Sequence, residues 1–423
     1  MKPRNLRSLA FALSGALALA CSSQRVSQPA EGGGAGMAGK PATSQAGSYF
    51  MPSGGAAGAV GSVAGGVAGS VAGGAAGAFD GGAGGEGPGP CSAAALEGLT
   101  AFAEGGWDPL GYPPYALDGC TLVYVAAAEG TDNGALHLRD LATGQDQVLQ
   151  AAAQHPRRPA VAGAVVAWES DGADGSQVHV RYSGGAKLFE KSFALAAEPR
   201  ATNDAVVFTV FETASVTADT DVKLFDVTTQ DLIPIATGLG QQRFSDVSPT
   251  HVAVTDFSED PKGYFDSQGS ISDIIVIERA TLERTVRAAA GKQAFPLLGE
   301  GGVLAYLAWG AVHPEPKFSQ FRLMTGKLST PVASDVNVKD TDLPVNTNPA
   351  YVRPSLRGSN LDYIDEVANE PQLFRANLAT LAPPVAANLP AAARLLGPVA
   401  ADTLTLVAKP LGDGSLSLVA VAR

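Results

Sequence analysis

The order of apolar and polar positions repeats along most of the chain. The clearest copy covers residues 155–180 and reads HPRRPAVAGAVVAWESDGADGSQVHV. A basic residue and a proline lead into a small-residue turn at Gly163, and an apolar run from Val165 to Trp168 follows. An acidic, glycine-rich turn separates this run from an alternating segment, residues 177–180. Short apolar runs and period-two alternation between glycine-rich turns are typical of β-strands.

Six further segments show the same order of turn, apolar strand, polar turn and second strand, at intervals of roughly 40 to just under 60 residues. The turn and the apolar strand of each unit together cover residues 119–124, 163–168, 203–208, 250–254, 301–306, 358–363 and 401–406. The second strands cover residues 136–139, 178–181, 222–225, 274–277, 321–323, 372–375 and 416–419. With almost no helical periodicity, the pattern predicts an all-β fold, a β-propeller of seven blades, with six as the alternative. A β-sandwich with long loops would not explain seven copies of one residue pattern in the same order.

Two further features concern the ring. Several units carry a proline step before the turn, such as Arg158-Pro159 and Arg353-Pro354, which suits a strand entered through a tight turn. A closed ring needs an N-terminal strand to complete the last blade, and residues 98–103 (GLTAFA) are the candidate. We expect the apolar strands themselves to line the channel.

The N-terminus has the pattern of an export signal. Positive charges within residues 2–7 precede an apolar run, residues 8–20, that is too short to span a bilayer and stops at Cys21. This start resembles a bacterial lipoprotein signal peptide: Ala20 fits the lipobox, whereas residues 18–19 depart from it. The resemblance implies cleavage before Cys21 and acylation of its sulfur. An ordinary cleaved signal peptide with a chance cysteine is the alternative.

Residues 22–90 consist mainly of Gly, Ala, Ser and Val. Such a tract cannot bury enough surface to offset the entropy of ordering it, so it is expected to be a flexible tether. The chain is therefore expected to contain a signal peptide (1–20), a Gly/Ala-rich tether (21–90) and a propeller (91–423). Behind a signal peptide, Cys91 and Cys120 are expected to form a disulfide, with two free buried thiols as the alternative.

Two phrases, RRPAVAGAVVAWESD with QVHVRYSGG and GALHLRDLATGQDQVL, resemble TolB-like β-propeller repeats. The resemblance covers about residues 114–423 and implies blade architecture, not an activity. TolB has six blades and an N-terminal domain, whereas this chain has seven units and a Gly/Ala tether in that place. The partner of TolB, a peptidoglycan-associated lipoprotein, is therefore not carried over.

Charge and candidate chemistry narrow the functional classes. The net charge of −12, with no basic run, argues against nucleic-acid binding. His137 and His179 occupy equivalent strand positions, which favours a repeated structural slot over a metal pair. No cofactor is expected. Calcium is kept as an alternative for the acidic loop of residues 255–273, although its order does not match an EF-hand. A single acidic residue inside the apolar strands, Asp362, is too little for a glycosidase.

The loops that interrupt the repeat are the candidate binding elements. Exposed aromatic and polar loop side chains suit contact with a protein or a carbohydrate, with ordinary loop packing as the alternative. The candidate residues are Asp260, Tyr264, Phe265, Asp266, His313 and Phe318.

These features lead to one functional expectation. We expect a lipid-anchored cell-envelope protein at the outer membrane that presents a non-catalytic propeller to an envelope protein or glycan. A propeller-type polysaccharide hydrolase or lyase is the alternative.

Overall fold

The computed structural model describes residues 91, 96, 99–101, 111–126, 134–184, 187–215, 217–264, 271–289, 291–309, 321–341, 353–367, 370–387, 396–411 and 416–423. The chain divides into two compact units, Met1–Gly74 and Ala75–Arg423, and every described residue belongs to the second. Cys21 and the segments expected to form the signal peptide and the tether lie outside the described residues. Within these ranges, no helix is long and apolar enough to cross a membrane.

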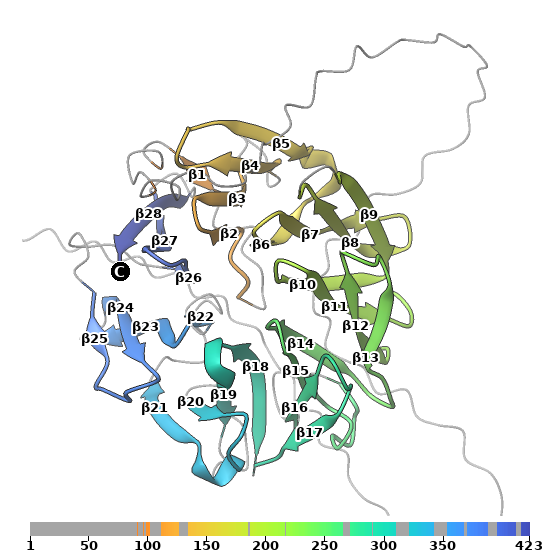
Figure 1. Ribbon diagram of the computed structural model, residues 1–423, viewed down its shortest axis with the longest axis vertical. Coiled ribbons are helices and arrows are strands. Elements are labelled where there is room, and N and C mark those ends of the chain that lie inside the picture. Colours follow the sequence, from red (N-terminus) through yellow and green to blue (C-terminus); the bar gives the residue numbers. More distant parts are fainter. Residues whose placement is uncertain are drawn as a thin grey trace, which may run out of the picture. The chain divides into compact units, whose positions relative to one another are not determined.

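Seven four-stranded antiparallel sheets make up the described part of the chain. Figure 1 shows them arranged around a common centre, so the fold is a β-propeller with seven blades rather than six. In chain order the blades consist of β2 (Tyr115–Asp118), β3 (Thr121–Val125), β4 (Leu136–Asp140) and β5 (Asp146–Gln150); β6 (Arg157–Ala162), β7 (Val165–Gly172), β8 (Gly175–Tyr182) and β9 (Phe189–Ala194); β10 (Ala196–Ala201), β11 (Ala205–Phe211), β12 (Thr220–Asp226) and β13 (Leu232–Ala236); β14 (Gln242–Val247), β15 (His251–Asp256), β16 (Asp273–Glu278) and β17 (Arg284–Arg287); β18 (Lys292–Leu298), β19 (Val303–Trp309), β20 (Phe321–Lys327) and β21 (Val336–Thr341); β22 (Ser355–Arg357), β23 (Asn360–Val367), β24 (Glu370–Asn377) and β25 (Val385–Ala386); β26 (Leu396–Ala400), β27 (Leu404–Pro410), β28 (Leu416–Ala422) and β1 (Thr100–Ala101).

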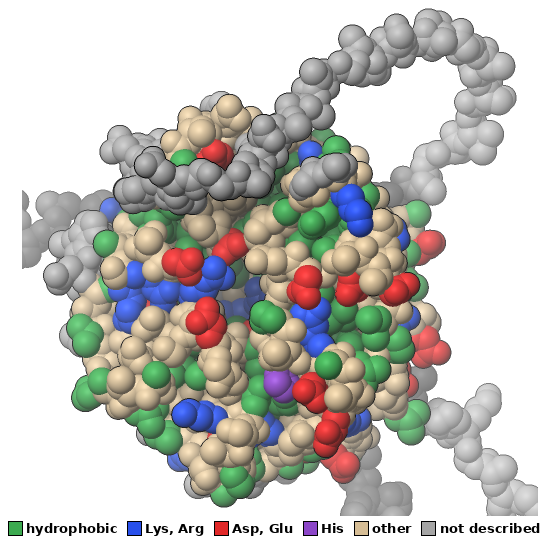
Figure 2. All heavy atoms as spheres, viewed as in Figure 1, with side chains coloured by type: hydrophobic (Ala, Val, Ile, Leu, Met, Phe, Trp, Pro, Cys, Tyr) green, Lys and Arg blue, Asp and Glu red, His purple; other side chains and the backbone are tan. Residues whose placement is uncertain are grey.

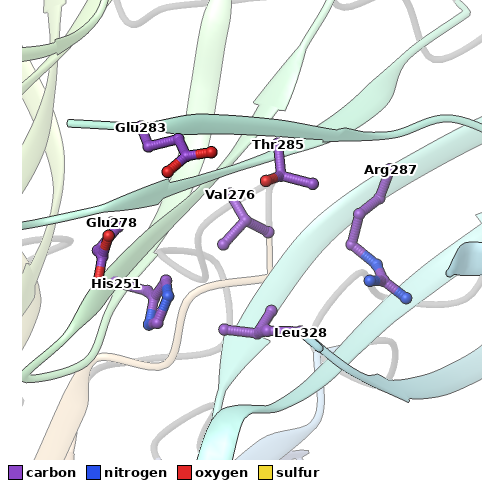
Figure 3. A pocket seen from close by; sticks show the side chains of 7 residues that line it. All are labelled: His251, Val276, Glu278, Glu283, Thr285, Arg287 and Leu328. Atoms are coloured by element: carbon purple, nitrogen blue, oxygen red, sulfur yellow. The ribbon is translucent and has the colours of Figure 1, made fainter. Parts of the chain in front are cut away.

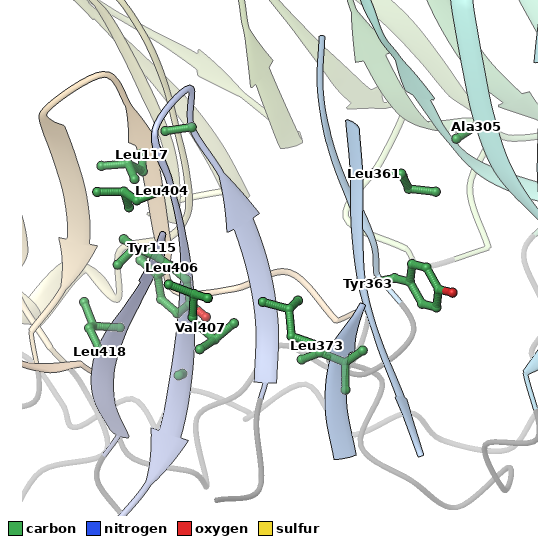
Figure 4. Packing of buried hydrophobic residues seen from close by; sticks show 14 of the residues in the cluster. Tyr115, Leu117, Ala305, Leu361, Tyr363, Leu373, Leu404, Leu406, Val407 and Leu418 are labelled. Atoms are coloured by element: carbon green, nitrogen blue, oxygen red, sulfur yellow. The ribbon is translucent and has the colours of Figure 1, made fainter. Parts of the chain in front are cut away.

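The second strand of each blade supplies much of the core, because both faces of the strand are covered. In β11, for example, Val206, Val207 and Phe208 are fully buried. The largest apolar cluster connects blades across the point where the ring closes: Tyr115 of the first blade packs with Leu406 of the last. Figure 4 shows these side chains filling the space between neighbouring sheets. Burial of apolar surface between blades therefore stabilises the ring.

The expectation that the apolar strands line the channel is wrong. The innermost strand of each blade is the one before it: β2, β6, β10, β14, β18, β22 or β26. These seven strands contact one another around the centre. The apolar strands are second in their sheets because only a strand covered on both faces needs a continuous apolar run. The innermost strands carry prolines and charged residues instead.

A β-bulge recurs in the innermost strands. The register shifts within β6, β10, β14, β18 and β26, and the residue after the last regular pair has a left-handed backbone. These residues are Arg158 (φ 49°), Glu198 (φ 62°), Phe244 (φ 51°), Phe295 (φ 57°) and Gly397 (φ 43°). For a residue other than glycine this conformation costs on the order of 1 kcal/mol. Because this conformation recurs in five blades, we infer that the architecture requires it. A bulge turns a side chain away from the direction that it would have in a regular strand.

The ring is closed by the strand that the sequence pattern predicted. Thr100 and Ala101 of β1 pair with Ser417 and Leu416 of β28, so a segment upstream of the first blade completes the last one. Cys91, nine residues before this strand, forms a disulfide with Cys120 at the start of β3, with a Cα–Cα distance of 5.2 Å. The closing segment is thus covalently tied to the first blade.

Polar contacts between blades explain the acidic residue of the LDYIDE strand. Asp362 is fully buried, and its carboxylate accepts a hydrogen bond from Arg375 Nε at 2.8 Å. Thr405 of the last blade donates to the same carboxylate, and Arg423 Nε lies 3.5 Å from it. Asp362 therefore joins the sixth blade to the seventh.

Candidate axial binding site

Side chains from six of the seven blades meet at the centre of the ring. Tyr112 lies just before β2, and Arg353 lies just before β22; the others lie in β6, β10, β14 and β18. Figure 1 shows the segment before β2 entering the middle of the ring. We call this group the axial cluster; it consists of Tyr112, Arg158, Arg200, Phe244, Phe295 and Arg353.

Tyr112 is the centre of the axial cluster. Its ring is 2% exposed and lies under three guanidinium groups. The ring centroid is 3.5 Å from Cζ of Arg353, 4.9 Å from that of Arg200 and 5.1 Å from that of Arg158. Such cation–π contacts are favourable, and more so away from water. Burial raises the pKa of Tyr112, and the nearby arginines oppose that rise.

Arg353 lies between two aromatic surfaces. Its Cζ is 3.5 Å from the centroid of Tyr112 and 4.4 Å from that of Phe295. Phe295 in turn packs on Phe244, with ring centroids 4.5 Å apart. These contacts join the sixth blade to the first, fourth and fifth, and they fix the plane of the guanidinium. Tyr112 contacts arginines of the second, third and sixth blades, and Arg353 also contacts aromatic rings of the fourth and fifth blades, so the two side chains meet in the middle of the ring.

Two buried glutamates hold the arginines of this region in place. Glu169 is 2% exposed and accepts hydrogen bonds from Arg157 Nε and Arg158 Nη1, both at 2.8 Å. Its Oε2 also accepts the backbone N–H of Glu198 at 3.1 Å. The carboxylate of the second blade thus binds both its own arginines and the bulge of the third blade.

Glu198 repeats this arrangement one blade further on. Its side chain is fully buried and lies 2.6 Å from Arg243 Nη2. It also accepts hydrogen bonds from Thr209 Oγ1 at 3.0 Å and from the N–H of Phe244, the bulge residue of the fourth blade, at 3.1 Å. Burial alone would raise the pKa of Glu198, but the guanidinium of Arg243 and these hydrogen bonds hold it below its usual value of 4.5. Glu198 is therefore an ionised structural group.

Arg200 differs from the other arginines near the axis. It follows the bulge in β10, is partly exposed, and contacts the Tyr112 ring. Among the described residues it makes no hydrogen bond or ion pair. Asp246 of β14 interacts electrostatically with Arg200, and its carboxylate accepts the N–H of Leu298 at 2.7 Å. Burial raises the pKa of Asp246, although Arg200 lowers it in part.

This arrangement suits binding of an anionic group. Glu169 and Glu198 both accept hydrogen bonds from arginines and from backbone N–H groups, so their carboxylates are engaged within the ring. Arginine side chains with fixed planes present several donors to a carboxylate or phosphate. Figure 2 shows that one face of the molecule is hollowed near its middle, with Lys and Arg side chains in and beside the hollow.

A second concavity lies between the fourth and fifth blades. It has a volume of about 250 Å³, and Figure 3 shows Glu278 and Glu283 on one side of it and Arg287 on the other. Arg287 is bound to Asp335 and to the carbonyl of Thr330 at 2.8 Å, so it joins the two blades. His251, also in the lining, bonds the hydroxyl of Thr250. These groups are mainly engaged in structural contacts.

The structure places two of the predicted loop residues. Asp260 is 7% exposed, and its carboxylate accepts the backbone N–H groups of Lys262 at 2.8 Å and Ile271 at 2.6 Å, so it organises its own loop. Tyr264 is half-buried, with the Lys262 ammonium 6.0 Å from its ring centroid. The structure does not bring either residue to the axial cluster through any described contact. The other four candidates, Phe265, Asp266, His313 and Phe318, lie outside the described residues.

The paired histidines occupy a repeated slot. His179 stacks on Trp168 at 5.0 Å and bonds Ser170 and Ser192, each at 2.8 Å; burial lowers its pKa. His137 likewise lies against the equivalent aromatic residue of its own blade, with ring centroids 5.3 Å apart. Among the described residues no cluster of His, Cys, Asp and Glu is arranged to hold a metal ion.

The axial cluster was not recognised from the sequence, although a signal for it exists. Six of the seven blades carry a residue followed by proline at the start of the innermost strand: Tyr112-Pro113, Arg158-Pro159, Glu198-Pro199, Phe295-Pro296, Arg353-Pro354 and Gly397-Pro398. The fourth blade has Phe244-Ser245 in this place. Aligning the units on this step, rather than on the apolar strand, would have brought together every member of the axial cluster except Arg200, which lies two residues further on.

Comparison with known proteins identifies the fold. No family model and no curated protein matches the sequence. The β-propeller domain of the Trilobed protease from Pyrococcus furiosus is similar, with a TM-score of 0.53 and 11% identity over 77% of this chain and 93% of that one. The tricorn protease is similar with a TM-score of 0.50 and 12% identity, over 76% of this chain and 34% of that one. TolB from Acinetobacter baumannii matches at 13% identity over 62% of each chain, with a TM-score of 0.42.

These similarities concern architecture. The Trilobed match and the seven sheets confirm the predicted propeller, and TolB proteins are among the solved structures that match this chain. The chain spans about 62% of the TolB structure and about a third of the tricorn protease, so the activities of those proteins are not transferred with the fold.

Proposed function

We propose that the protein is a cell-envelope lipoprotein, anchored at the outer membrane through Cys21, whose propeller binds an envelope protein or glycan without chemically altering it. The observation that carries the binding role is the axial cluster, in which guanidinium groups are held by aromatic rings while the nearby carboxylates are saturated. No resident cofactor is proposed.

The cluster also supports binding over passage of a substrate through the ring. Tyr112 and Arg353 meet in the middle of the ring, where Cζ of Arg353 lies 3.5 Å from the centroid of the Tyr112 ring. A polymer would therefore meet side chains at the axis instead of passing between the blades. A ring that is filled by side chains at the level of Tyr112 and Arg353 offers a recess in which a ligand can bind.

The proposed anchor predicts that the chain incorporates a fatty-acid analogue. In bacterial cells that express the full chain and are fed an alkyne-bearing fatty acid, we expect labelled wild type and unlabelled Cys21→Ser. Cys91→Ser, which changes a cysteine of the folded unit, is the matched control and is expected to keep the label. Labelling of Cys21→Ser equal to wild type would contradict the anchor.

The proposed binding role predicts that capture of an envelope component depends on the axial cluster. With the full chain immobilised, we expect a solubilised protein or glycan to be retained by wild type and to fall at least 10-fold with Arg353→Met, since the stacked guanidinium is lost. Arg279→Met removes an arginine that binds Asp204 away from the axis, and it should retain wild-type capture. Thermal melting checks that each variant is folded.

Two results would contradict a non-catalytic binding role. Equal capture by wild type and both variants would show that the axis is not used. Turnover of a polysaccharide that is abolished by Glu169→Gln would instead favour the alternative, a propeller-type hydrolase or lyase.

A further inference from the structure

We infer that the axial hollow binds the free C-terminal carboxylate of a peptide, recognised by the guanidinium of Arg200 and the hydroxyl of Tyr112. This inference rests on the proposed binding function and specifies the chemistry of its ligand. The proposed site recognises the C-terminal end of a peptide ligand, whatever the amino-acid sequence of that peptide.

Arg200 is the arginine with donors available for a ligand. Arg158 is bound to Glu169 at 2.8 Å, and Arg243 is bound to Glu198 at 2.6 Å. Arg200 is partly exposed and, among the described residues, its guanidinium contacts only the Tyr112 ring, with no hydrogen bond or ion pair to occupy its donors. A guanidinium edge matches the two oxygens of a carboxylate.

The hydroxyl of Tyr112 supplies a second donor next to this arginine. It is buried, with the whole residue 2% exposed, and it has no hydrogen-bond partner in the described part of the chain. Buried hydroxyls are ordinarily hydrogen-bonded, so an acceptor is expected at this position. Because Arg158, Arg200 and Arg353 all lie within about 5 Å of the ring, that acceptor is expected to be anionic.

Asp246 is the acidic group that could compete for Arg200. One of its oxygens already accepts the N–H of Leu298 at 2.7 Å, which joins the fourth blade to the fifth. No ion pair connects Asp246 and Arg200. The carboxylate of Asp246 is thus directed to the neighbouring blade, and the edge of Arg200 remains available.

The blocked axis favours the end of an extended chain. Since the side chains of Tyr112 and Arg353 meet in the middle of the ring, we expect a ligand that enters the hollow to stop there. The C-terminus of a peptide carries its carboxylate at the tip of a narrow chain. A uronate carries its carboxylate on the side of a wide pyranose ring, so a glycan would reach the same donors less readily.

The test compares two random hexapeptide libraries, both synthesised without Asp and Glu, which differ only at the C-terminus: free acid in one and amide in the other. Each is passed over the immobilised full chain, and the retained mass is measured. We expect at least 10-fold greater retention of the free-acid library by wild type. Arg200→Gln should remove this preference, and Arg279→Gln should keep it.

A second variant separates recognition from folding. Tyr112→Phe keeps the stacked ring and removes only the hydroxyl, so we expect an unchanged melting temperature and a several-fold loss of the free-acid preference. Equal retention of both libraries by wild type would overturn the inference. Retention of a glucuronate-terminated oligosaccharide in preference to the free-acid peptides would also overturn it.

The two proposals fail separately. If an envelope component is captured through Arg353 but the libraries are not distinguished, the binding function stands and the terminal-carboxylate inference falls. If neither the component nor either library depends on the axial residues, both fall.

Discussion

Replacing Glu198 by glutamine is expected to lower the free energy of unfolding by about 3–5 kcal/mol, the range found when one partner of a buried ion pair is removed. Glu198 is fully buried, lies 2.6 Å from Arg243 Nη2, and accepts the N–H of the next blade's bulge. An amide would leave the guanidinium of Arg243 buried without its counter-charge. Urea unfolding of the full chain, followed by tryptophan fluorescence, measures the change.

Two controls and one contradicting outcome belong to this prediction. Glu212→Gln changes an exposed glutamate of the same blade and should alter stability by less than 0.5 kcal/mol, as is usual for surface positions. Adding Arg243→Met to Glu198→Gln should recover part of the loss, because the orphaned charge is removed. A loss below about 1 kcal/mol for Glu198→Gln would show that the pair is not a main support of the ring.

The same pair should contribute to acid denaturation. The folded-state pKa of Glu198 lies below its usual value of 4.5, so the folded protein binds this proton less readily than the unfolded chain. Its stabilisation is therefore fully present above the unfolded pKa and is lost as the pH falls through the folded value. We expect the stability of Glu198→Gln to fall less steeply below about pH 4.5 than that of wild type.

Loss of the disulfide should have an effect of similar size. A link between residues separated by 29 positions is expected to stabilise the fold by about 3–4 kcal/mol, chiefly by restricting the unfolded chain. We expect the Cys91→Ser, Cys120→Ser double variant to be destabilised by this amount in urea unfolding. The same change is expected for wild type under reducing conditions.

The disulfide prediction also has a local readout. Because β1 has only two residues, β28 should lose protection from hydrogen exchange when Cys91 no longer holds the closing segment near the ring. Protection of β12, in a blade away from the closure, is the internal comparison and should change less. Unchanged exchange at β28 in the double variant would show that β1 stays paired without the disulfide.

The sequence revealed the blades because the second strand has a simple physical requirement. Val206 and Val207 are buried on opposite faces of their sheet, so a continuous apolar run is needed there, and it repeats in every unit. The turn at Gly163 is visible for a similar reason: its φ of 52° suits glycine. The closing strand could be predicted because a ring without it would leave β28 as an open edge.

The innermost strands gave no such pattern. In β10 the bulge at Glu198 breaks the alternation, and the residues around it include a proline and an arginine. Their role depends on partners in other blades: Arg353 contacts Tyr112, which lies near the other end of the folded unit in sequence. A charged residue next to a proline therefore looks like an ordinary turn until the ring is assembled.

The pairing of Cys91 with Cys120 also determines where mechanical load enters the ring. Any pull on the chain upstream of residue 91 reaches the disulfide before it reaches β1. The force passes through a covalent bond into the start of β3, and the two-residue strand that closes the last blade is shielded from it. Under tension, the short β1–β28 pairing, which has few hydrogen bonds, therefore carries little of the force.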